Sequence, residues 1–339
     1  MHRFSYRWNL ADGYPTPDIT KHGKTVFTTF ACGGGSSMGY KLAGYDVVGA
    51  NDIDPKMAMI YKKNHKPKHF FECPISDLLT MELPQELYNL DVLDGSPPCS
   101  TFSMAGTREK TWKKNKKFRE GQQEQVLSDL FFDWIKLVER LQPKVAIAEN
   151  VKGMLAGNAK LYTKRVVRAL EAIGYSVQLF LLNSASMGVP QRRERVFFIC
   201  SKINKSIELQ FNERPVPFGS IDEGVAGIRL PITGEYQKRI FRESTSHHGH
   251  TKSKKSNSIV GFYYRCSSLA VLPTIKATQR HFYKDGCVWL SDNEVKLGSS
   301  FPLDYDKCGL DINYVAGMSV PPVMMANVAY EVYNQLLKD

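Results

Sequence analysis

The chain has 339 residues, of which 42% are hydrophobic and 23% charged, which is enough apolar material for a sizeable core and about two domains. Its net charge of +11 favours a polyanionic partner, nucleic acid first, although an ordinary basic enzyme has the same balance. The seven cysteines form no CxxC pair, and the sequence has neither an apolar leader nor an apolar run long enough for a bilayer. These features argue against a zinc site, a disulfide framework, secretion and membrane insertion. We expect a cytoplasmic protein without a metal site.

Strands and helices are predicted to alternate through the first two thirds of the chain. The expected strands cover residues 25–30, 45–50, 69–72, 90–94, 145–148, 176–182 and 196–200, and the expected helices cover 38–43, 55–64, 128–141 and 159–173. This alternation indicates an α/β protein with a mostly parallel sheet and helices on both faces. Beyond residue 202, prolines, glycines and a polar basic stretch at 247–256 are typical of a smaller, irregular domain. A last amphipathic helix is predicted over 321–338.

The first predicted strand leads into a glycine-rich loop, Phe30-Ala31-Cys32-Gly33-Gly34-Gly35. Glycine lets the backbone approach a ligand closely, and the helix that follows offers free N–H groups. Asp52 and Asp54 come about twenty residues later, after the second strand, where carboxylates bind ribose hydroxyls. The spacing suits a nucleoside cofactor. Glycines also serve simple tight turns, however, and the loop departs from GxGxxG.

Three further groups of residues lie at strand ends. Cys99 follows Pro97 and Pro98 after the strand at 90–94. It is either a nucleophile that the two prolines hold in a rigid backbone or a small buried thiol. Glu149 ends the strand at 145–148, and either binds substrate or caps the next turn. The segment Gln191-Arg192-Arg193-Glu194-Arg195 enters the strand at 196–200, either for planar multi-donor recognition or as a solvated edge.

In their order along the chain, these motifs resemble those of the DNA (cytosine-5) methyltransferase family, of the bacterial restriction–modification type. Five blocks carry the resemblance, at 30–35, 51–55, 95–100, 149–151 and 191–195, and weaker likenesses lie at 290–302 and 314–322. The resemblance implies a Rossmann-like sheet that binds S-adenosylmethionine, with a smaller, irregular target-recognition domain. The implied parts are an N-terminal arm at 1–24, a catalytic domain at 25–202, a target-recognition domain at 203–300, and a C-terminal return at 301–339 that completes the catalytic domain.

The resemblance also implies the chemistry. The Cys99 thiolate would add to C6 of cytosine, so that the ring becomes an enamine whose C5 takes the methyl group. Loss of the C5 proton and elimination of Cys99 would release 5-methylcytosine. Glu149 is expected to contact N3 and the exocyclic amine, Arg195 to hold O2, and Arg193 to help fix the carboxylate and the sulfur.

The cofactor and substrate contacts are carried over by the same resemblance. Phe30 would stack on the adenine, Asp52 would bind the ribose, and Ser319 and Val320 would lie near the methionine end. The remaining cofactor contacts are expected at Ala31, Gly33, Gly34, Gly35, Ile53, Ile75, Asp77 and Pro97. Contacts to the substrate are expected at Pro98, Ser100, Ser103, Arg108 and Gln191, with residues 100–125 as a basic lid over a flipped base.

The chain also departs from the family pattern. The family often has an acidic residue where this chain has Thr28, and a glycine where it has Cys32. The third motif aligns with Cys73-Pro74-Ile75, so that Asp77 would supply its acid, and Met318 replaces an asparagine of the tenth. These departures concern cofactor binding more than chemistry, and we expect an active enzyme.

Double-stranded DNA is the expected partner, bound by a monomer that associates with the bacterial nucleoid through DNA. A cognate restriction endonuclease that acts on the same site is expected as well. Two alternatives stay open: a tRNA cytosine-5 methyltransferase of the same fold, and a catalytically inactive DNA-binding relative. The long variable segment after residue 195 favours a DNA target, and the presence of Cys99, Glu149 and Arg195 favours activity.

Overall fold

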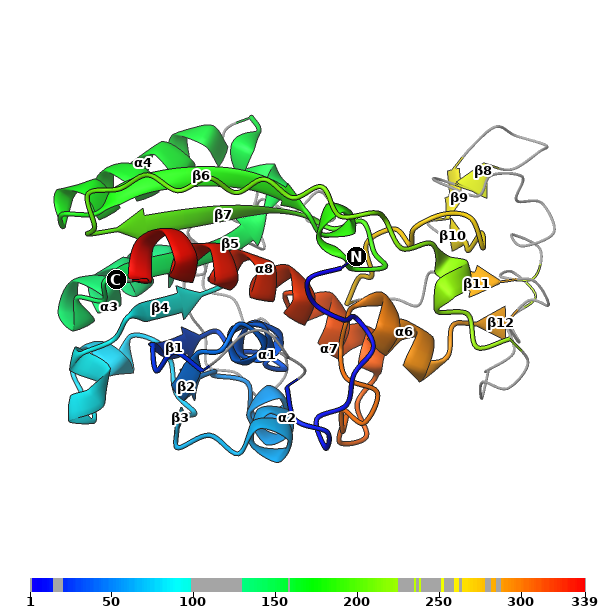
Figure 1. Ribbon diagram of the computed structural model, residues 1–339, viewed down its shortest axis with the longest axis horizontal. Helices are drawn as coiled ribbons and strands as arrows, with labels where there is room; N and C mark the ends of the chain where they lie inside the picture. The colour runs from blue at the N-terminus through cyan, green and yellow to red at the C-terminus, as the bar shows by residue number, and fades with distance from the viewer. Residues whose placement is uncertain are drawn as a thin grey trace. The chain divides into compact units, whose positions relative to one another are not determined.

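Figure 1 shows the chain as a computed structural model. The structure describes residues 2–14, 21–98, 130–157, 159–224, 235, 238, 251–252, 259–261, 264–277, 282–284 and 288–338. The chain forms two compact units. The sheet unit comprises 16–183, 194–210 and 325–339, and the second unit comprises 1–15, 184–193 and 211–324. The predicted domain boundaries at residues 24, 202 and 300 stay predictions.

A seven-stranded sheet organises the sheet unit, in the order β3-β2-β1-β4-β5-β7-β6. Strands β3, β2, β1, β4 and β5 are parallel, and β7 is antiparallel to both β5 and β6. The strands are β1 (Thr25–Thr29), β2 (Asp46–Asn51), β3 (His69–Phe71), β4 (Val92–Gly95), β5 (Val145–Val151), β6 (Ser176–Asn183) and β7 (Glu194–Ser201). The predicted α/β class with a mostly parallel sheet is confirmed.

Helices cover both faces of this sheet. They are α1 (Gly35–Leu42), α2 (Pro55–His65), α3 (Leu130–Leu141) and α4 (Ala159–Ala172), and α8 (Pro322–Val332) returns to the sheet unit near the end of the chain. Local signals set their ends. In α2, for example, the Asp54 side chain accepts a hydrogen bond from the Lys56 N–H, Pro55 occupies the first turn, and left-handed Lys66 ends the helix.

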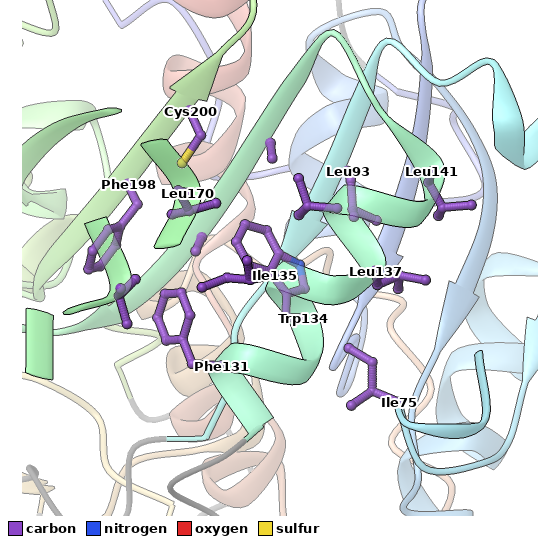
Figure 2. Close-up of a cluster of buried hydrophobic side chains, with 14 of the residues drawn as sticks. Ile75, Leu93, Phe131, Trp134, Ile135, Leu137, Leu141, Leu170, Phe198 and Cys200 are labelled. Carbon is purple, nitrogen blue, oxygen red and sulfur yellow. The ribbon is translucent and has the colours of Figure 1, made fainter. Parts of the chain in front are cut away.

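Residues alternate between the two faces along each strand, and the core on one face is apolar. Phe27, Leu93, Ala146 and Phe198 belong to a buried cluster with residues of α3 and α4, and Trp134 of α3 is completely buried in it (Figure 2). The amphipathic spacing of α3 therefore produces the packing that the sequence predicts.

The opposite face carries a buried polar layer between the sheet and α1 and α2. The Thr28 hydroxyl lies 3.0 Å from that of Ser37, and the Ser37 hydroxyl lies 2.7 Å from that of Tyr61. The Tyr40 hydroxyl donates to Asp94 Oδ1 at 3.2 Å. Hydroxyls thus satisfy one another across three elements of this face.

The order of the strands creates a switch point between β1 and β4. From β1 the chain moves outward through β2 to β3, and it then returns to place β4 on the other side of β1. Ligands of open α/β sheets bind at the carboxyl ends of the strands at such a point. The loop after β1 and the segment 96–98 after β4 begin there, because Thr29 is paired with Gly95.

The second unit contains short elements, as the sequence predicts. Its helices include α6 (Asp292–Gly298), which a Ser291–Glu294 capping box starts, and α7 (Ile312–Met318). Its strands are β8 (Thr251–Lys252), β9 (Ile259–Gly261), β10 (Tyr264–Arg265), β11 (Phe282–Lys284) and β12 (Val288–Trp289). Within the described parts of the chain, no helix is long and apolar enough to cross a membrane.

Gly95, the last residue of β4, is packed too closely to carry a side chain. A Cβ there would lie 2.3 Å from Trp134 Nε1 and 2.9 Å from Thr29 Oγ1. We expect Gly95→Ala to lower the free energy of unfolding by about 1–3 kcal/mol, because overpacking forces neighbours apart. Urea denaturation of this variant and of the same variant in a Trp134→Phe background measures it. If the substitution costs the same in both backgrounds, contact with the indole is not the cause.

Candidate active site

The glycine-rich loop between β1 and α1 has a strained backbone. Phe30, Cys32 and Gly34 have φ angles of +52°, +50° and +81°, in the left-handed region. Two of these three residues are not glycine, and such strain persists only where the surroundings hold it. The Ala31 N–H donates to the Asn51 carbonyl at 3.0 Å and anchors the start of the loop to the end of β2.

Asp52, the predicted ribose ligand, also holds this loop. Its Oδ2 accepts the Cys32 N–H at 2.7 Å, and its Oδ1 accepts the Asp54 N–H at 2.8 Å. The residue is 7% exposed, and Ile53 beside it is half-buried. One carboxylate thus fixes the strained turn and the start of α2 together, at the carboxyl ends of β1 and β2.

The two residues predicted after β3 have different surroundings. Ile75 is buried in the apolar core cluster, whereas Asp77 is exposed at the start of a 3₁₀ turn. The Asn51 side chain donates to the carbonyls of Phe71 and Cys73 at 2.9 and 2.8 Å, and so connects this segment to β2. Sequence reasoning did not single out Asn51, although it directly precedes the predicted ribose acid.

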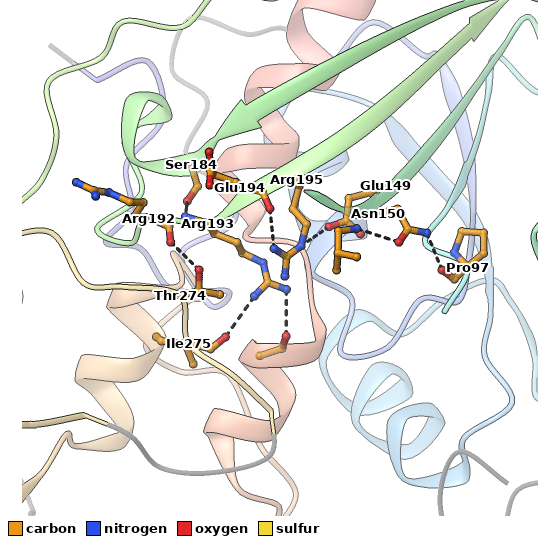
Figure 3. A network of polar contacts seen from close by, with 12 residues as sticks. Pro97, Glu149, Asn150, Ser184, Arg192, Arg193, Glu194, Arg195, Thr274 and Ile275 are labelled. Carbon is orange, nitrogen blue, oxygen red and sulfur yellow. Dashed lines mark hydrogen bonds and ion pairs between the residues drawn. The ribbon is translucent and has the colours of Figure 1, made fainter. Parts of the chain in front are cut away.

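The segment that leads to the predicted nucleophile is held by the neighbouring strand. Pro97 is buried and Pro98 half-buried, and the Asn150 side chain of β5 donates to the Pro97 carbonyl at 3.1 Å (Figure 3). Asn150 lies in the motif at 149–151, and its place directly after Glu149 is the sequence signal for this role. The predicted site residues Cys99, Ser100, Ser103 and Arg108 lie outside the described residues.

Glu149 and Arg195 form an ion pair on one face of the sheet. Arg195 Nε lies 2.9 Å from Glu149 Oε1, with side chains 14% and 10% exposed, respectively (Figure 3). Antiparallel pairing sets Val151 opposite Arg195 and Glu149 opposite Phe197, which puts Glu149 and Arg195 diagonally on the same face. Burial lowers the pKa of Arg195, and the Glu149 carboxylate opposes this shift.

Comparison with known proteins agrees with this geometry. The family model of the C-5 cytosine-specific DNA methylases matches residues 25–221, which include the loop after β1, Glu149 and Arg195. The chain belongs to this family. The resemblance inferred from the five motifs is therefore confirmed.

Curated relatives match this chain over part of their length. M.FnuDI of Fusobacterium nucleatum, a Type II methyltransferase, is 33% identical over 192 residues, which are 57% of this chain and 50% of that protein. M.NgoPII of Neisseria gonorrhoeae, another Type II methyltransferase, is 31% identical over 205 residues, 60% of this chain and 54% of that protein. These matches span about half the length of the relatives.

Solved structures share the fold. A DNMT2 variant of Spodoptera frugiperda superposes with a TM-score of 0.66 at 16% identity, over 92% of this chain and 100% of that chain. The methyltransferase EhMeth of Entamoeba histolytica gives 0.60 at 15% identity, over 94% and 99%. At these identities the likeness concerns the fold alone, and it supports the predicted Rossmann-like class.

In this member of the family, Gln191 and Arg193 bind backbone groups within the second unit, to which both residues belong. The Gln191 amide donates to the Gly298 carbonyl at 3.2 Å and accepts the Ile275 N–H at 2.9 Å. The Arg193 guanidinium donates to the carbonyls of Ile275 at 3.3 Å and Gly317 at 3.0 Å (Figure 3). Both side chains are almost completely buried, so these contacts join the chain just before β7 to α7 and to the segment around Ile275.

Ser319 and Val320, the predicted contacts at the methionine end, are buried in the second unit. The Ser319 hydroxyl donates to the Val315 carbonyl at 2.8 Å and helps to close the last turn of α7. Their role toward a cofactor stays a prediction. Among the described residues, no group of three or more His, Cys, Asp or Glu side chains is placed to hold a metal ion.

Asp94 of β4 is a buried carboxyl that sequence analysis missed. Burial raises its pKa to about 7, hydrogen bonds from Tyr40 and Ser36 oppose the shift, and the charge of Glu149 adds to it. Asp94 pairs with Ile147, two residues before Glu149 on the adjacent strand, so the two carboxyls share a face of the sheet. The available signal was a charged residue within the apolar run Val92-Leu93-Asp94.

The raised pKa of Asp94 links stability to pH. Below pH 4 both the folded and unfolded chains hold this proton, and from about pH 4 to 7 only the folded chain does, so stability falls as pH rises through this window. The expected slope is at most about 1.4 kcal/mol per pH unit. Urea denaturation at pH 5, 6, 7 and 8 should show a smaller loss in Asp94→Asn, which has no such proton. Parallel curves for the two proteins would rule this linkage out.

Loss of Arg195 should leave the Glu149 carboxylate buried without its partner. We expect Arg195→Met to lower the free energy of unfolding by about 3 kcal/mol, because removal of one member of a buried pair leaves an uncompensated charge. Differential scanning calorimetry measures the change. The double variant Arg195→Met/Glu149→Gln is the control, and it should recover part of the loss because the charge is then gone. A single variant as stable as wild type is the contrary result.

Proposed function

We propose that this chain transfers a methyl group from S-adenosylmethionine to C5 of a flipped cytosine in duplex DNA, through a transient bond between Cys99 Sγ and C6. The observation that carries the proposal is the Glu149–Arg195 ion pair on the sheet beside the segment that leads to Cys99. Family membership and the net charge of +11 support the same function.

The ion pair has the donors and acceptors that cytosine requires. Cytosine presents O2 and N3 as acceptors and its exocyclic amine as a donor. Arg195 supplies N–H groups for O2. Glu149 accepts from the amine with one oxygen and, when protonated, donates to N3 with the other. A thymine, with N3–H and O4, has the opposite pattern at the two positions that Glu149 contacts.

Glu149 and Arg195 also stabilise the charge that develops during addition. When the thiolate bonds to C6, electron density moves toward N3 and O2, and these are the atoms that Glu149 and Arg195 contact. Both side chains are shielded from solvent, which strengthens such interactions. Elimination of Cys99 after loss of the C5 proton restores the aromatic ring.

The nucleophile must approach C6 from a fixed position, and two hydrogen bonds hold the segment that precedes Cys99. Asn150 binds the Pro97 carbonyl, and the Thr29 hydroxyl donates to the Asp94 carbonyl at 2.8 Å. The two prolines reduce the freedom of the chain between these anchors and Cys99. We assign Pro98, Ser100, Ser103, Arg108 and Gln191 to the substrate side, and Arg193 to support of the catalytic groups.

The residues after β1 fit S-adenosylmethionine, which supplies an electrophilic methyl group when bound. Gly34 is the N-cap of α1 and has no side chain to cover the first-turn N–H groups, so these can receive a carboxylate. We assign Phe30, which is half-buried directly after β1, to the adenine, and Asp52, which directly follows β2, to the ribose. We assign Ala31, Gly33, Gly35, Ile53, Ile75, Asp77, Pro97, Ser319 and Val320 to the remaining contacts.

The relatives M.FnuDI and M.NgoPII are named Type II methyltransferases. We propose by analogy that this chain acts as a monomer and modifies a specific DNA sequence that a cognate restriction endonuclease would cut. Bisulfite sequencing of a plasmid recovered from cells that express the chain identifies that sequence.

Transfer of labelled methyl from S-adenosylmethionine to unmethylated duplex DNA tests the function. We expect label at cytosine C5 with wild type, loss of at least 1,000-fold with Cys99→Ser because the poorer nucleophile prevents addition, and no loss with Cys308→Ser. A duplex with 5-fluorocytosine at the target should trap wild type as a covalent complex, because fluorine cannot leave as the C5 proton does.

Three outcomes would contradict the proposal. Equal transfer by wild type and Cys99→Ser removes the nucleophile, and label only in tRNA selects the RNA methyltransferase alternative. Absence of transfer to any nucleic acid selects an inactive relative.

A further inference from the structure

His65, the last residue of α2, is a buried histidine directly beneath the glycine-rich loop. It is 7% exposed, and its ring stacks on Tyr61 with centroids 4.4 Å apart and planes 28° apart. Its Nε2 lies 3.4 Å from the Gly33 carbonyl oxygen. A carbonyl only accepts hydrogen bonds, so the contact assigns the proton to Nε2.

The ring is neutral, and one of its nitrogens is buried at a cost. Burial and the charge of Lys41 lower the pKa of His65 to about 3. Its Nδ1 has no hydrogen-bond partner among the described residues. An unsatisfied buried polar atom destabilises a fold, so an aromatic side chain without nitrogen would pack here at lower cost. An aromatic side chain without nitrogen would, however, lack the hydrogen bond from Nε2 to the Gly33 carbonyl.

The His65 ring occupies the space that a side chain on residue 34 would need. A Cβ on Gly34 would lie 2.0 Å from His65 Nε2, and Gly34 has a φ of +81°. The backbone can approach the ring this closely only because residue 34 has no side chain. The ring therefore limits where the left-handed turn before α1 can lie.

The strained loop is thus held at two points. Asp52 binds the N–H of Cys32, and His65 binds the carbonyl of the next residue, Gly33. Tyr61, on which His65 stacks, is itself fixed by its hydroxyl contact to Ser37 of α1. Asp52 directly follows β2 and His65 ends α2, so both contacts hold the loop against the adjacent part of the sheet unit.

We propose that His65 is a positioning residue that holds the loop of residues 30–35 in the conformation that binds the cofactor. This inference rests on the proposed function, since it takes S-adenosylmethionine as the ligand of that loop. His65 acts through Gly33 and Gly34, and it sets the direction of the first N–H groups of α1. Its loss should weaken cofactor binding more than the chemical step.

Two variants of His65 and one control test the proposal. His65→Phe keeps an aromatic ring and removes the N–H donor, and His65→Gln keeps a donor without the ring. His22→Phe is the matched control, because His22 also places Nε2 by a backbone carbonyl, that of Ala43 at 3.2 Å, and stacks on Tyr333 at 3.9 Å. His22 is in the same unit but does not contact residues 30–35 through these bonds.

Amide hydrogen exchange of residues 30–35 is measured first, on full-length protein without cofactor, and the dissociation constant of S-adenosylmethionine follows by calorimetry. We expect His65→Phe to speed exchange in this loop and weaken binding about 3- to 10-fold, which corresponds to one lost hydrogen bond. His65→Gln should retain part of the affinity, His22→Phe should match wild type in both measurements, and kcat at saturating cofactor should change less than twofold.

Unchanged exchange and affinity in His65→Phe would overturn the proposal, and so would equal effects of His22→Phe. If His65→Phe does not fold, His65→Gln and the exchange of its loop decide the question. If wild type binds no S-adenosylmethionine, the proposed function fails, while the exchange data still show whether His65 holds the loop.

Discussion

The antiparallel pairing of β7 with β5 is the constraint on which the candidate active site depends. This pairing continues through Glu149, Asn150 and Val151, beyond the end of β4 at Gly95. Because alternate residues share a face, the register brings Glu149 and Arg195 together while Asn150 reaches the Pro97 carbonyl. A slip of either strand by one residue would turn its charged group to the face of α3 and α4, into an apolar core and away from its partner. The same register thus separates the apolar face, which packs against α3 and α4, from the face that carries the candidate site. It also places the Glu149–Arg195 ion pair beside the segment 96–98 that leads to Cys99.

The face that carries the candidate site is held together by hydrogen bonds between buried polar groups. The burial of such groups costs free energy. Thr28, Ser37, Tyr61 and Tyr40 satisfy one another or Asp94, a carboxyl that burial makes reluctant to ionise. The acid that the family often has at the position of Thr28 is absent, and Asp94, its partner in register on β4, supplies a carboxyl on the same face. The apolar face of α3 and α4 offsets these costs through hydrophobic burial.

The sequence predicted the α/β fold and the motifs at the ends of its strands because both depend on local patterns. Apolar runs bounded by glycine, proline and charged residues marked the strands, and the motifs fell at their ends. The pattern failed where tertiary pairing decides: polar Glu149 and Asn150 look like the end of a strand, whereas the structure includes them in β5 because β7 lies beside them. Asp94 and His65 were missed for a related reason. A carboxyl inside a strand and a histidine at the end of a helix gain meaning only from Tyr40 or Gly33, which are distant in sequence.

The glycine-rich loop shows how backbone strain and anchoring are coupled. A left-handed conformation at a non-glycine residue costs about 1–2 kcal/mol, and Phe30 and Cys32 both adopt it. Cys32 stands where the family often has glycine, so this chain has less intrinsic freedom to form the turn. Two hydrogen bonds offset that strain. The Asp52 carboxylate accepts the Cys32 N–H in a charge-assisted bond, and the neutral His65 imidazole donates to the Gly33 carbonyl. The conformation of the loop is therefore set by β2 and α2 as much as by its own glycines, and substitutions in those two elements should affect cofactor binding even where they do not contact the ligand.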